Sequence, residues 1–138
     1  MEGYVHMKNK KTPSKSTVWK KCSEYNRRKN ADTDGHVACC SCGKVKHWKE
    51  QDCGHFYPRS NGKALYWTPE NLHAQCRGCN GYHKERGKIG YTKFMIDKYG
   101  REFVDNLEQR ARGIYRERKS DLVYWNDFYT SRLKALNE

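Results

Sequence analysis

Two short stretches decide the fold: Cys39-Cys-Ser-Cys42 and Cys76-Arg-Gly-Cys79. Each is a Cys-x-x-Cys pair, which places two thiolates on one tight turn. Two such turns complete a tetrahedral sulfur site with no open position, and this is typical of structural zinc. The alternatives are unrelated buried thiols, an iron–sulfur cluster, or a shifted pairing that uses Cys40. The spacing favours a Cys39, Cys42, Cys76 and Cys79 zinc site.

The composition indicates a small domain that needs such a support. The chain has 138 residues, of which 36% are hydrophobic and 32% charged. A structural zinc ion adds about 10 kcal/mol or more of binding free energy to folding, which compensates for a small core. We find no apolar run long enough to span a membrane and no signal peptide, so we expect a cytoplasmic protein. In a reducing compartment, paired cysteines are better interpreted as metal ligands than as disulfide partners.

The charge is strongly positive and uneven. There are 28 Lys and Arg against 16 Asp and Glu, a formal net charge of +12, and nine of these basic residues lie in the first thirty positions. A basic segment beside a compact centre is typical of a protein that binds nucleic acid, although a solvated tail gives the same pattern. The DNA contacts we expect from the leading helix are Lys20, Lys21, Arg27, Arg28 and Lys29.

The pattern along the chain predicts three regions. They are a flexible basic arm over 1–15, a zinc-stapled core with a leading basic helix over 16–90, and a helical region over 91–138. Within the core we expect an extended hairpin segment over 36–57, an exposed loop over 59–69, and a turn followed by a short helix over 71–85.

Three helices are expected in the last region. The first two cover 91–99 and 101–112, with Gly100 ending the first of them. Ser120 can cap the third, whose apolar stripe is a candidate dimer interface. The stripe comprises Leu122, Trp125, Phe128 or Tyr129, Leu133 and Leu136.

A second group of residues carries possible chemistry. Asp52 and His55 come at the end of the extended segment, and Asn80 directly follows the last cysteine. A zinc knuckle is expected to place Asn80 at the start of a helix that packs on the hairpin, so these side chains would converge. Carboxylate and amide oxygens suit magnesium or manganese, and a neutral histidine suits proton abstraction.

This order of residues resembles that of the HNH, or ββα-metal, nucleases, and especially the cysteine-stapled form found in phage endonuclease VII. The string from Asp52 to Arg59 and the string from Pro69 to Asn80 are still more similar to the phage NinG (Rap) recombination endonucleases. That likeness covers roughly residues 16–138. It implies an α+β fold with a zinc-stapled ββα-metal core, an N-terminal basic helix and a C-terminal helical extension.

The resemblance also implies roles for individual residues. His55 would be the general base that activates water, and Asp52 and Asn80 would hold one catalytic Mg²⁺ or Mn²⁺. Asn71 would hold the loop so that the histidine is correctly oriented. Arg59 would clamp a phosphate, with Arg77 as the second choice. The DNA contacts expected near this site are Arg59, Arg77 and Lys84.

We therefore expect a metal-dependent DNA endonuclease that cuts branched recombination intermediates such as Holliday junctions. Because a four-way junction needs two symmetric cuts, a homodimer is expected. A phage-encoded protein of this kind would act in the cytoplasm of its bacterial host. The alternatives are a zinc-stapled DNA-binding or recombination adaptor that does not cut, and an HNH nuclease for single-stranded or nonspecific DNA. The roles of His73, His83, Cys22, Cys40 and Cys53 stay open.

Overall fold

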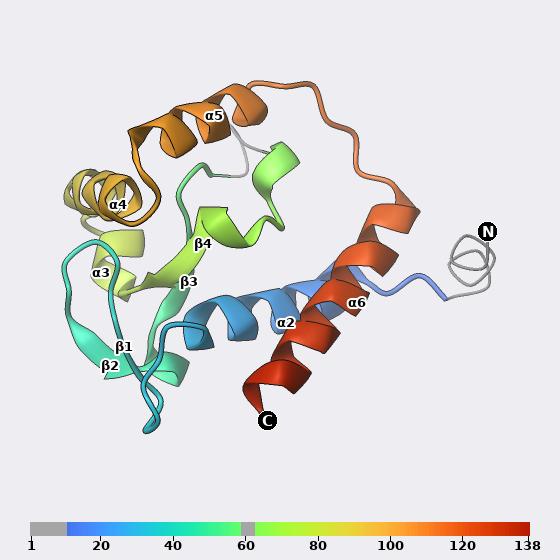
Figure 1. Cartoon of the computed structure of the whole chain (residues 1–138), viewed down its shortest axis with the longest axis horizontal. Coiled ribbons are helices and arrows are strands. Elements are labelled where there is room, and N and C mark those ends of the chain that lie inside the picture. The colour runs from blue at the N-terminus through green and yellow to red at the C-terminus, as the bar shows by residue number, and fades with distance from the viewer. Residues whose placement is uncertain (1–10, 59–62) are drawn as a thin grey trace. The chain divides into compact units, whose positions relative to one another are not determined.

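The computed structural model describes residues 11–58 and 63–138, and over these the fold is mixed α+β, as predicted (Figure 1). The helices and strands of the described residues are α2 (Lys15–Arg28), β1 (His36–Ala38), β2 (Val45–His47), β3 (Asp52–His55), β4 (Leu72–Gln75), α3 (Arg77–Asn80), α4 (Lys84–Tyr99), α5 (Arg101–Ala111) and α6 (Lys119–Leu136). Short 3-10 helices lie at Trp48–Glu50, Lys63–Leu65 and Pro69–Asn71.

The chain forms two compact units. One joins the N-terminal segment up to Tyr25 with Arg116–Glu138, and the other is Asn26–Tyr115. Helix α6 is thus grouped with α2, whereas α4 and α5 are grouped with the strands. The regions drawn from the sequence at residues 15 and 90 stay a prediction, and most of the basic arm lies outside the described residues.

The larger unit contains two antiparallel hairpins. Strands β1 and β2 pair with each other, and β3 pairs with β4 so that His55 lies opposite Leu72. The turn predicted from residue 71 is wrong, because β4 occupies Leu72–Gln75. All four residues of β4 are buried, two of them polar, so the strand lacks the alternation of polar and apolar residues that identifies a half-buried strand.

The core of this unit lies between the hairpins and the two following helices. Its buried residues are Phe56, Leu65, Tyr91, Met95, Val104, Leu107 and Ala111. The predicted exposed loop is wrong in its second half, since Leu65 and Trp67 are almost fully buried. Residues 59–62 of that loop lie outside the described residues.

Helix α4 packs closely on the two cysteine turns through two glycines. A Cβ at Gly87 would overlap the backbone carbonyl of Cys79, and a Cβ at Gly90 would overlap that of Ser41. These glycines lie within α4, which begins at Lys84 and not near residue 91 as expected. The predicted end before Gly100 is confirmed, and α5 buries Val104, Leu107 and Ala111.

The smaller unit consists of α2 packed on α6. Lys21 Nζ donates to Asn126 Oδ1 at 2.9 Å and to Thr130 Oγ1 at 3.0 Å, and the rings of Tyr25 and Tyr129 lie 5.8 Å apart between centroids. The ammonium of Lys21, which we expected to contact DNA, therefore joins the two helices.

The last helix differs from its prediction at its start. It begins at Lys119 and is capped at Arg118, whose backbone N–H donates to Asp121 Oδ2 at 2.8 Å, so Ser120 is not the cap. Of the predicted stripe, Leu122 and Tyr129 are buried, together with Val123, while Leu136 is exposed. The buried part of the stripe packs within the unit.

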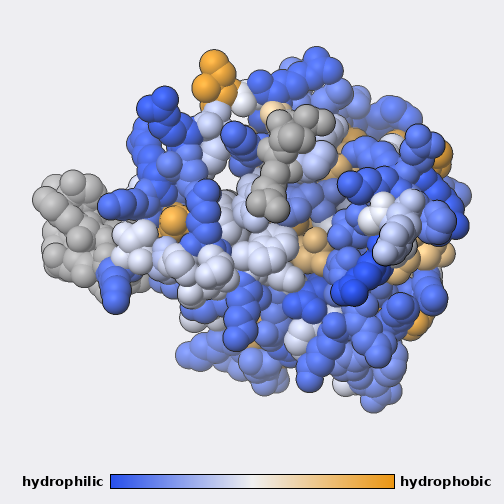
Figure 2. Space-filling model, turned by 180° about the vertical axis from the view of Figure 1, so that it is seen from behind, coloured by the Kyte–Doolittle hydropathy of each residue, from blue (hydrophilic) through white to orange (hydrophobic). Residues whose placement is uncertain are grey.

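The surface is largely hydrophilic on the face shown in Figure 2, where hydrophobic residues are separated from one another. Across the described part of the chain, we find no helix with the length and apolar character that crossing a membrane requires.

Lys29 holds the end of α2 against the loop before β4. Its ammonium donates to Asn26 Oδ1 at 2.9 Å, to the Pro69 carbonyl at 2.8 Å and to the Leu72 carbonyl at 2.7 Å. Three acceptors use all three N–H donors of a lysine. Lys29 therefore has a structural role in the larger unit, although we expected it to contact DNA.

We expect Lys29→Met to lower the free energy of unfolding by about 2–3 kcal/mol, because it leaves buried carbonyl oxygens without a charged donor. Urea unfolding followed by circular dichroism measures this. Lys20→Met, at an exposed position on α2, is the control and should change stability by less than about 0.5 kcal/mol. Equal stability of the two variants would contradict the structural role.

Candidate functional site

Four cysteine side chains meet between the β1–β2 turn and the start of α3. The Sγ atoms of Cys39, Cys42, Cys76 and Cys79 all lie within 4.8 Å of one another, and those of Cys42 and Cys76 are 3.8 Å apart. Four sulfur ligands at this spacing fit one tetrahedral zinc ion, and they leave no position for substrate. The predicted set of four cysteines is thus brought together, and it can hold a structural metal ion.

Backbone N–H groups point at the sulfurs, as in a metal knuckle. Cys39 Sγ accepts from the N–H of Ser41 at 3.3 Å and of Cys42 at 3.5 Å, and Cys76 Sγ accepts from the N–H of Cys79 at 3.4 Å. Burial raises the pKa of Cys79 to about 12. In Cys76 burial is outweighed by hydrogen bonds from Cys79 and the other thiols, which lower its pKa to about 7. A divalent cation stabilises all four thiolates, so its binding releases the remaining protons.

The other cysteines are outside this cluster. Cys40 turns its backbone N–H to the Ala74 carbonyl at 2.9 Å, and burial raises the pKa of its thiol well above the usual value. The shifted pairing through Cys40 is therefore not the one that forms. Cys22 is fully buried on α2, and Cys53 is buried on β3.

Asp52 and Asn80 come together beside the cysteine cluster. Asn80 Nδ2 donates to Asp52 Oδ2 at 3.2 Å, and Arg77 Nη2 lies 3.7 Å from Asp52 Oδ1. Asn80 is the last residue of α3 and not the first residue of a helix, because Cys76 is itself the N-cap and the helix starts between the two cysteines. The predicted neighbourhood is present, although the position of Asn80 in its helix was wrong.

His55 lies on the same strand as Asp52 and is oriented by the loop before β4. Its Nε2 is 3.1 Å from the Tyr66 carbonyl oxygen, and the two rings lie 4.9 Å apart between centroids. A carbonyl oxygen only accepts, so Nε2 carries the proton and Nδ1 is the basic nitrogen of the neutral ring. Tyr66 was missed in the sequence because it falls in the supposed exposed loop.

Asn71 holds the backbone that follows His55. Its Oδ1 accepts from the Tyr57 N–H at 2.8 Å, and its Nδ2 donates to the carbonyls of Tyr57 at 3.1 Å and Leu65 at 3.2 Å. The side chain is fully buried. Asn71 therefore links the end of β3 to the segment that carries Tyr66, the partner of His55.

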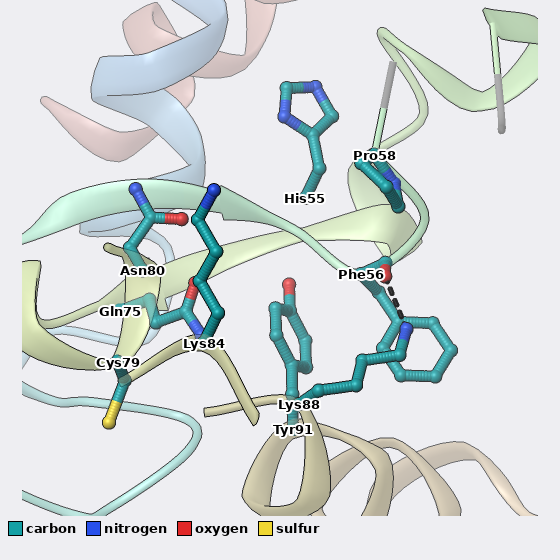
Figure 3. Close-up of a pocket in the computed structure, with 9 residues that line it drawn as sticks. All are labelled: His55, Phe56, Pro58, Gln75, Cys79, Asn80, Lys84, Lys88 and Tyr91. Atoms are coloured by element: carbon teal, nitrogen blue, oxygen red, sulfur yellow. Dashed lines mark hydrogen bonds between the residues drawn. The ribbon is translucent and has the colours of Figure 1, made fainter. Parts of the chain in front are cut away.

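A cavity of about 600 Å³ opens next to these residues. Figure 3 shows the side chains of His55, Asn80 and Lys84 extending toward the same side. Helix α4 also contributes Tyr91 and Lys88. The lining residues are His55, Phe56, Pro58, Gln75, Cys79, Asn80, Lys84, Lys88 and Tyr91. Lys88 was missed because the sequence pattern placed the start of its helix too late; its spacing of four from Lys84 was the available signal.

A buried histidine on β4 is hydrogen-bonded to helix α4. His73 lies between two tyrosines, with Nδ1 2.9 Å from Tyr91 Oη and Nε2 2.8 Å from Tyr99 Oη. The Tyr91 hydroxyl donates to the Gly54 carbonyl at 2.8 Å, which favours a proton on His73 Nδ1 and a hydrogen bond from Tyr99 to Nε2. Burial, with the nearby charges of Lys29 and Lys98, lowers the pKa of His73 to about 2.

The remaining residues expected to contact DNA are spread over the chain. Lys20, Arg77 and Lys84 are exposed. Arg27 and Arg28 lie over the ring of Trp48, at 5.0 Å and 5.4 Å from its centroid, and Arg27 also donates to the Trp48 carbonyl. Arg59 lies outside the described residues. His83 precedes α4 and is exposed, and no role follows for it.

We expect the purified protein to carry about one zinc ion per chain, and Cys42→Ser to lose it. Cys42 is the exposed member of the cluster, so this change removes a ligand with little loss of packing. Elemental analysis after dialysis and the melting temperature report the result. The control Cys40→Ser should keep the ion; equal zinc in both variants would contradict the assignment.

A separate prediction concerns His73, whose pKa is far below the usual 6.5. Below pH 6.5 the unfolded chain binds a proton at this histidine that the folded chain does not. The free energy of unfolding therefore decreases as the pH is lowered, by up to about 1.4 kcal/mol per pH unit. Above pH 6.5 this contribution is constant. His73→Gln should flatten the dependence between pH 7.5 and 5, measured by urea unfolding. Parallel curves for the two proteins would show that His73 titrates normally.

Comparison with known proteins gives a consistent family. The model of the family described as "Bacteriophage Lambda NinG protein" matches residues 6–138. Protein ninG of Escherichia phage lambda and that of Escherichia phage 933W are 31% identical to the chain over 77 residues, and protein ninG of Salmonella phage P22 is 30% identical over 77 residues.

These alignments cover 56% of this chain and 37% of each relative, so the chain matches well under half the length of these curated proteins. No solved structure matches the chain. Since the family model spans nearly the whole sequence, the chain belongs to the NinG family.

Proposed function

We propose that the protein is a metal-dependent DNA endonuclease of the HNH type that acts on branched recombination intermediates such as Holliday junctions. The observation that carries the proposal is the contact of Asp52 with Asn80 beside the four-cysteine cluster, with His55 on the same strand. An adaptor that only binds DNA has no need for a carboxylate, an amide and an oriented imidazole in one place.

The Asp52 and Asn80 pair fits a hard divalent cation. The amide nitrogen of Asn80 faces the carboxylate, and a half-turn of the amide would present its oxygen on that side instead. A carboxylate and an amide oxygen, completed by water and phosphate oxygens, form a donor set that Mg²⁺ or Mn²⁺ accepts. When bound, such an ion polarises a phosphate and stabilises the oxygen that leaves.

His55 fits the role of general base. Its Nε2–H is engaged by the Tyr66 carbonyl, so the ring is held in the tautomer whose Nδ1 can accept a proton from water. Asn71 braces the loop that supplies this carbonyl.

Arg77 and the cysteine cluster support the same centre. Arg77 lies 3.7 Å from Asp52 Oδ1 and is exposed, so its guanidinium can orient the carboxylate and also meet a phosphate. Cys76 caps the helix that ends at Asn80, and Cys79 lies within that helix. A closed zinc site would thus fix Asn80 without taking part in the reaction.

The substrate and assembly are part of the proposal. The net charge of +12 suits DNA, and two symmetric cuts in a four-way junction call for a homodimer. A phage-encoded enzyme of this kind would work in the host cytoplasm.

We expect His55→Ala to reduce cleavage of a synthetic four-way junction on the order of 10²–10⁴-fold, since this removes a general base. The assay follows nicked products on labelled junction, linear duplex and single strand, with and without magnesium or manganese. Preference for the junction supports the proposed substrate, and preference for another DNA reassigns it.

The matched control is His36→Ala, an exposed histidine on β1. It should cut like the wild type. Both variants should retain zinc and the wild-type melting temperature. Full activity of His55→Ala, or no cleavage by the wild type with any divalent ion, would overturn the nuclease proposal.

A further inference from the structure

The charges around the cavity are unbalanced. Among the residues that the structure describes, its lining contains two ammonium groups, from Lys84 and Lys88, and no carboxylate. Amide groups of Gln75 and Asn80 also lie on its wall. Neutral hydrogen-bonding groups with two uncompensated cations form an electropositive recess, which favours an anionic ligand.

Lys88 is held in place by the residue next to His55. Its Nζ donates to the Phe56 carbonyl at 2.6 Å and lies 3.7 Å from the centroid of the Phe56 ring and 4.9 Å from that of Tyr57 (Figure 3). An ammonium has three N–H groups, and this carbonyl uses one. Lys88 is thus a positioned cation that can still donate to a ligand, and little side-chain freedom is lost when it does.

The placement of the two lysines is unfavourable for the helix alone. They are four residues apart on α4, where like charges repel. Lys84 also lies in the first turn, where the helix dipole disfavours a cation. In the described part of the chain, no ion pair or hydrogen bond joins the ammonium of Lys84 to another residue. A bound anion would lower the repulsion between the two lysines.

We infer that Lys84 and Lys88 form a phosphate-binding subsite in this cavity, next to His55 and Asn80. Taking a backbone phosphodiester of DNA as its occupant rests on the proposed function. A free phosphate group offers the same anionic oxygens, so the test separates the two sources. Lys88 is the new residue here, and it lines the same cavity as His55.

The test measures DNA binding in buffer without magnesium or chelator, so that zinc is kept and cleavage is not needed. Lys88→Met should weaken duplex binding about 3- to 10-fold at 0.1 M salt and reduce the slope of log affinity against log salt by about 0.9, the value for one lost phosphate contact. Lys88→Arg keeps the charge and should keep the slope. Lys93→Met, an exposed lysine of α4 outside the cavity, should change the slope less.

A second arm titrates inorganic phosphate while NMR follows the ring resonances of His55. A shift in the wild type that is lost in Lys88→Met shows that the subsite also takes free phosphate. No shift, with the slope change intact, shows that it takes only DNA phosphate. Equal slopes for Lys88→Met and Lys93→Met, without a phosphate shift, would overturn the inference.

Two further measurements separate this inference from other effects. The melting temperature of Lys88→Met should stay within a few degrees of the wild type. If Lys88→Met is unfolded, the binding experiment is repeated with Lys84→Met, a change that breaks no hydrogen bond. Loss of binding in these variants, together with a wild type that never cleaves, would retain the subsite and reject the nuclease.

Discussion

The cluster of four thiols is the constraint on which the larger unit depends. It joins the β1–β2 turn to the start of α3, two elements separated by more than thirty residues of chain. Asn80 follows the last of these cysteines, and Asp52 lies opposite Gln75, the residue before Cys76. The relative position of Asp52 and Asn80 is therefore set by the geometry of the cluster. A metal ion bound there would stabilise the fold and the proposed catalytic centre through the same bonds.

A polar interior supplies what the small apolar core does not. Asn71 is fully buried and joins three backbone groups. His73 is hydrogen-bonded to two tyrosines of α4, and one of them, Tyr91, donates to the backbone of β3. Buried groups with satisfied hydrogen bonds define one arrangement of strands and loops, because each alternative would leave a buried donor or acceptor unpaired. This is how a chain with 36% hydrophobic residues can hold His55 in one orientation.

The features that were predictable from the sequence are local, and those that were not depend on distant partners. Cysteine spacing found the cluster, and periodicity with Gly100 found α5 and the end of α4. Strand β4 was missed because its polar residues find partners far away in sequence. Leu65 was assigned to an exposed loop because it lies between the turn-forming Asn61-Gly62 pair and Pro69. The glycines of α4 that contact the cysteine turns carry no signal of their own, since close approach exists only in the folded chain.

The same distinction applies to the basic residues. The sequence does not distinguish one lysine or arginine from another by its role. Their high density in the first thirty positions suggested that the leading helix is the main DNA contact. In the structure Lys21 and Lys29 hold helices and loops together, so part of that charge is used within the protein. Lys84 and Lys88, which lie outside the first thirty positions, face a recess whose lining includes no carboxylate from the described residues. Local balance of charge around a cavity is thus a better guide to an anion site than the density of lysine and arginine along the chain, because Coulomb interactions act over ångströms in space and not along the sequence.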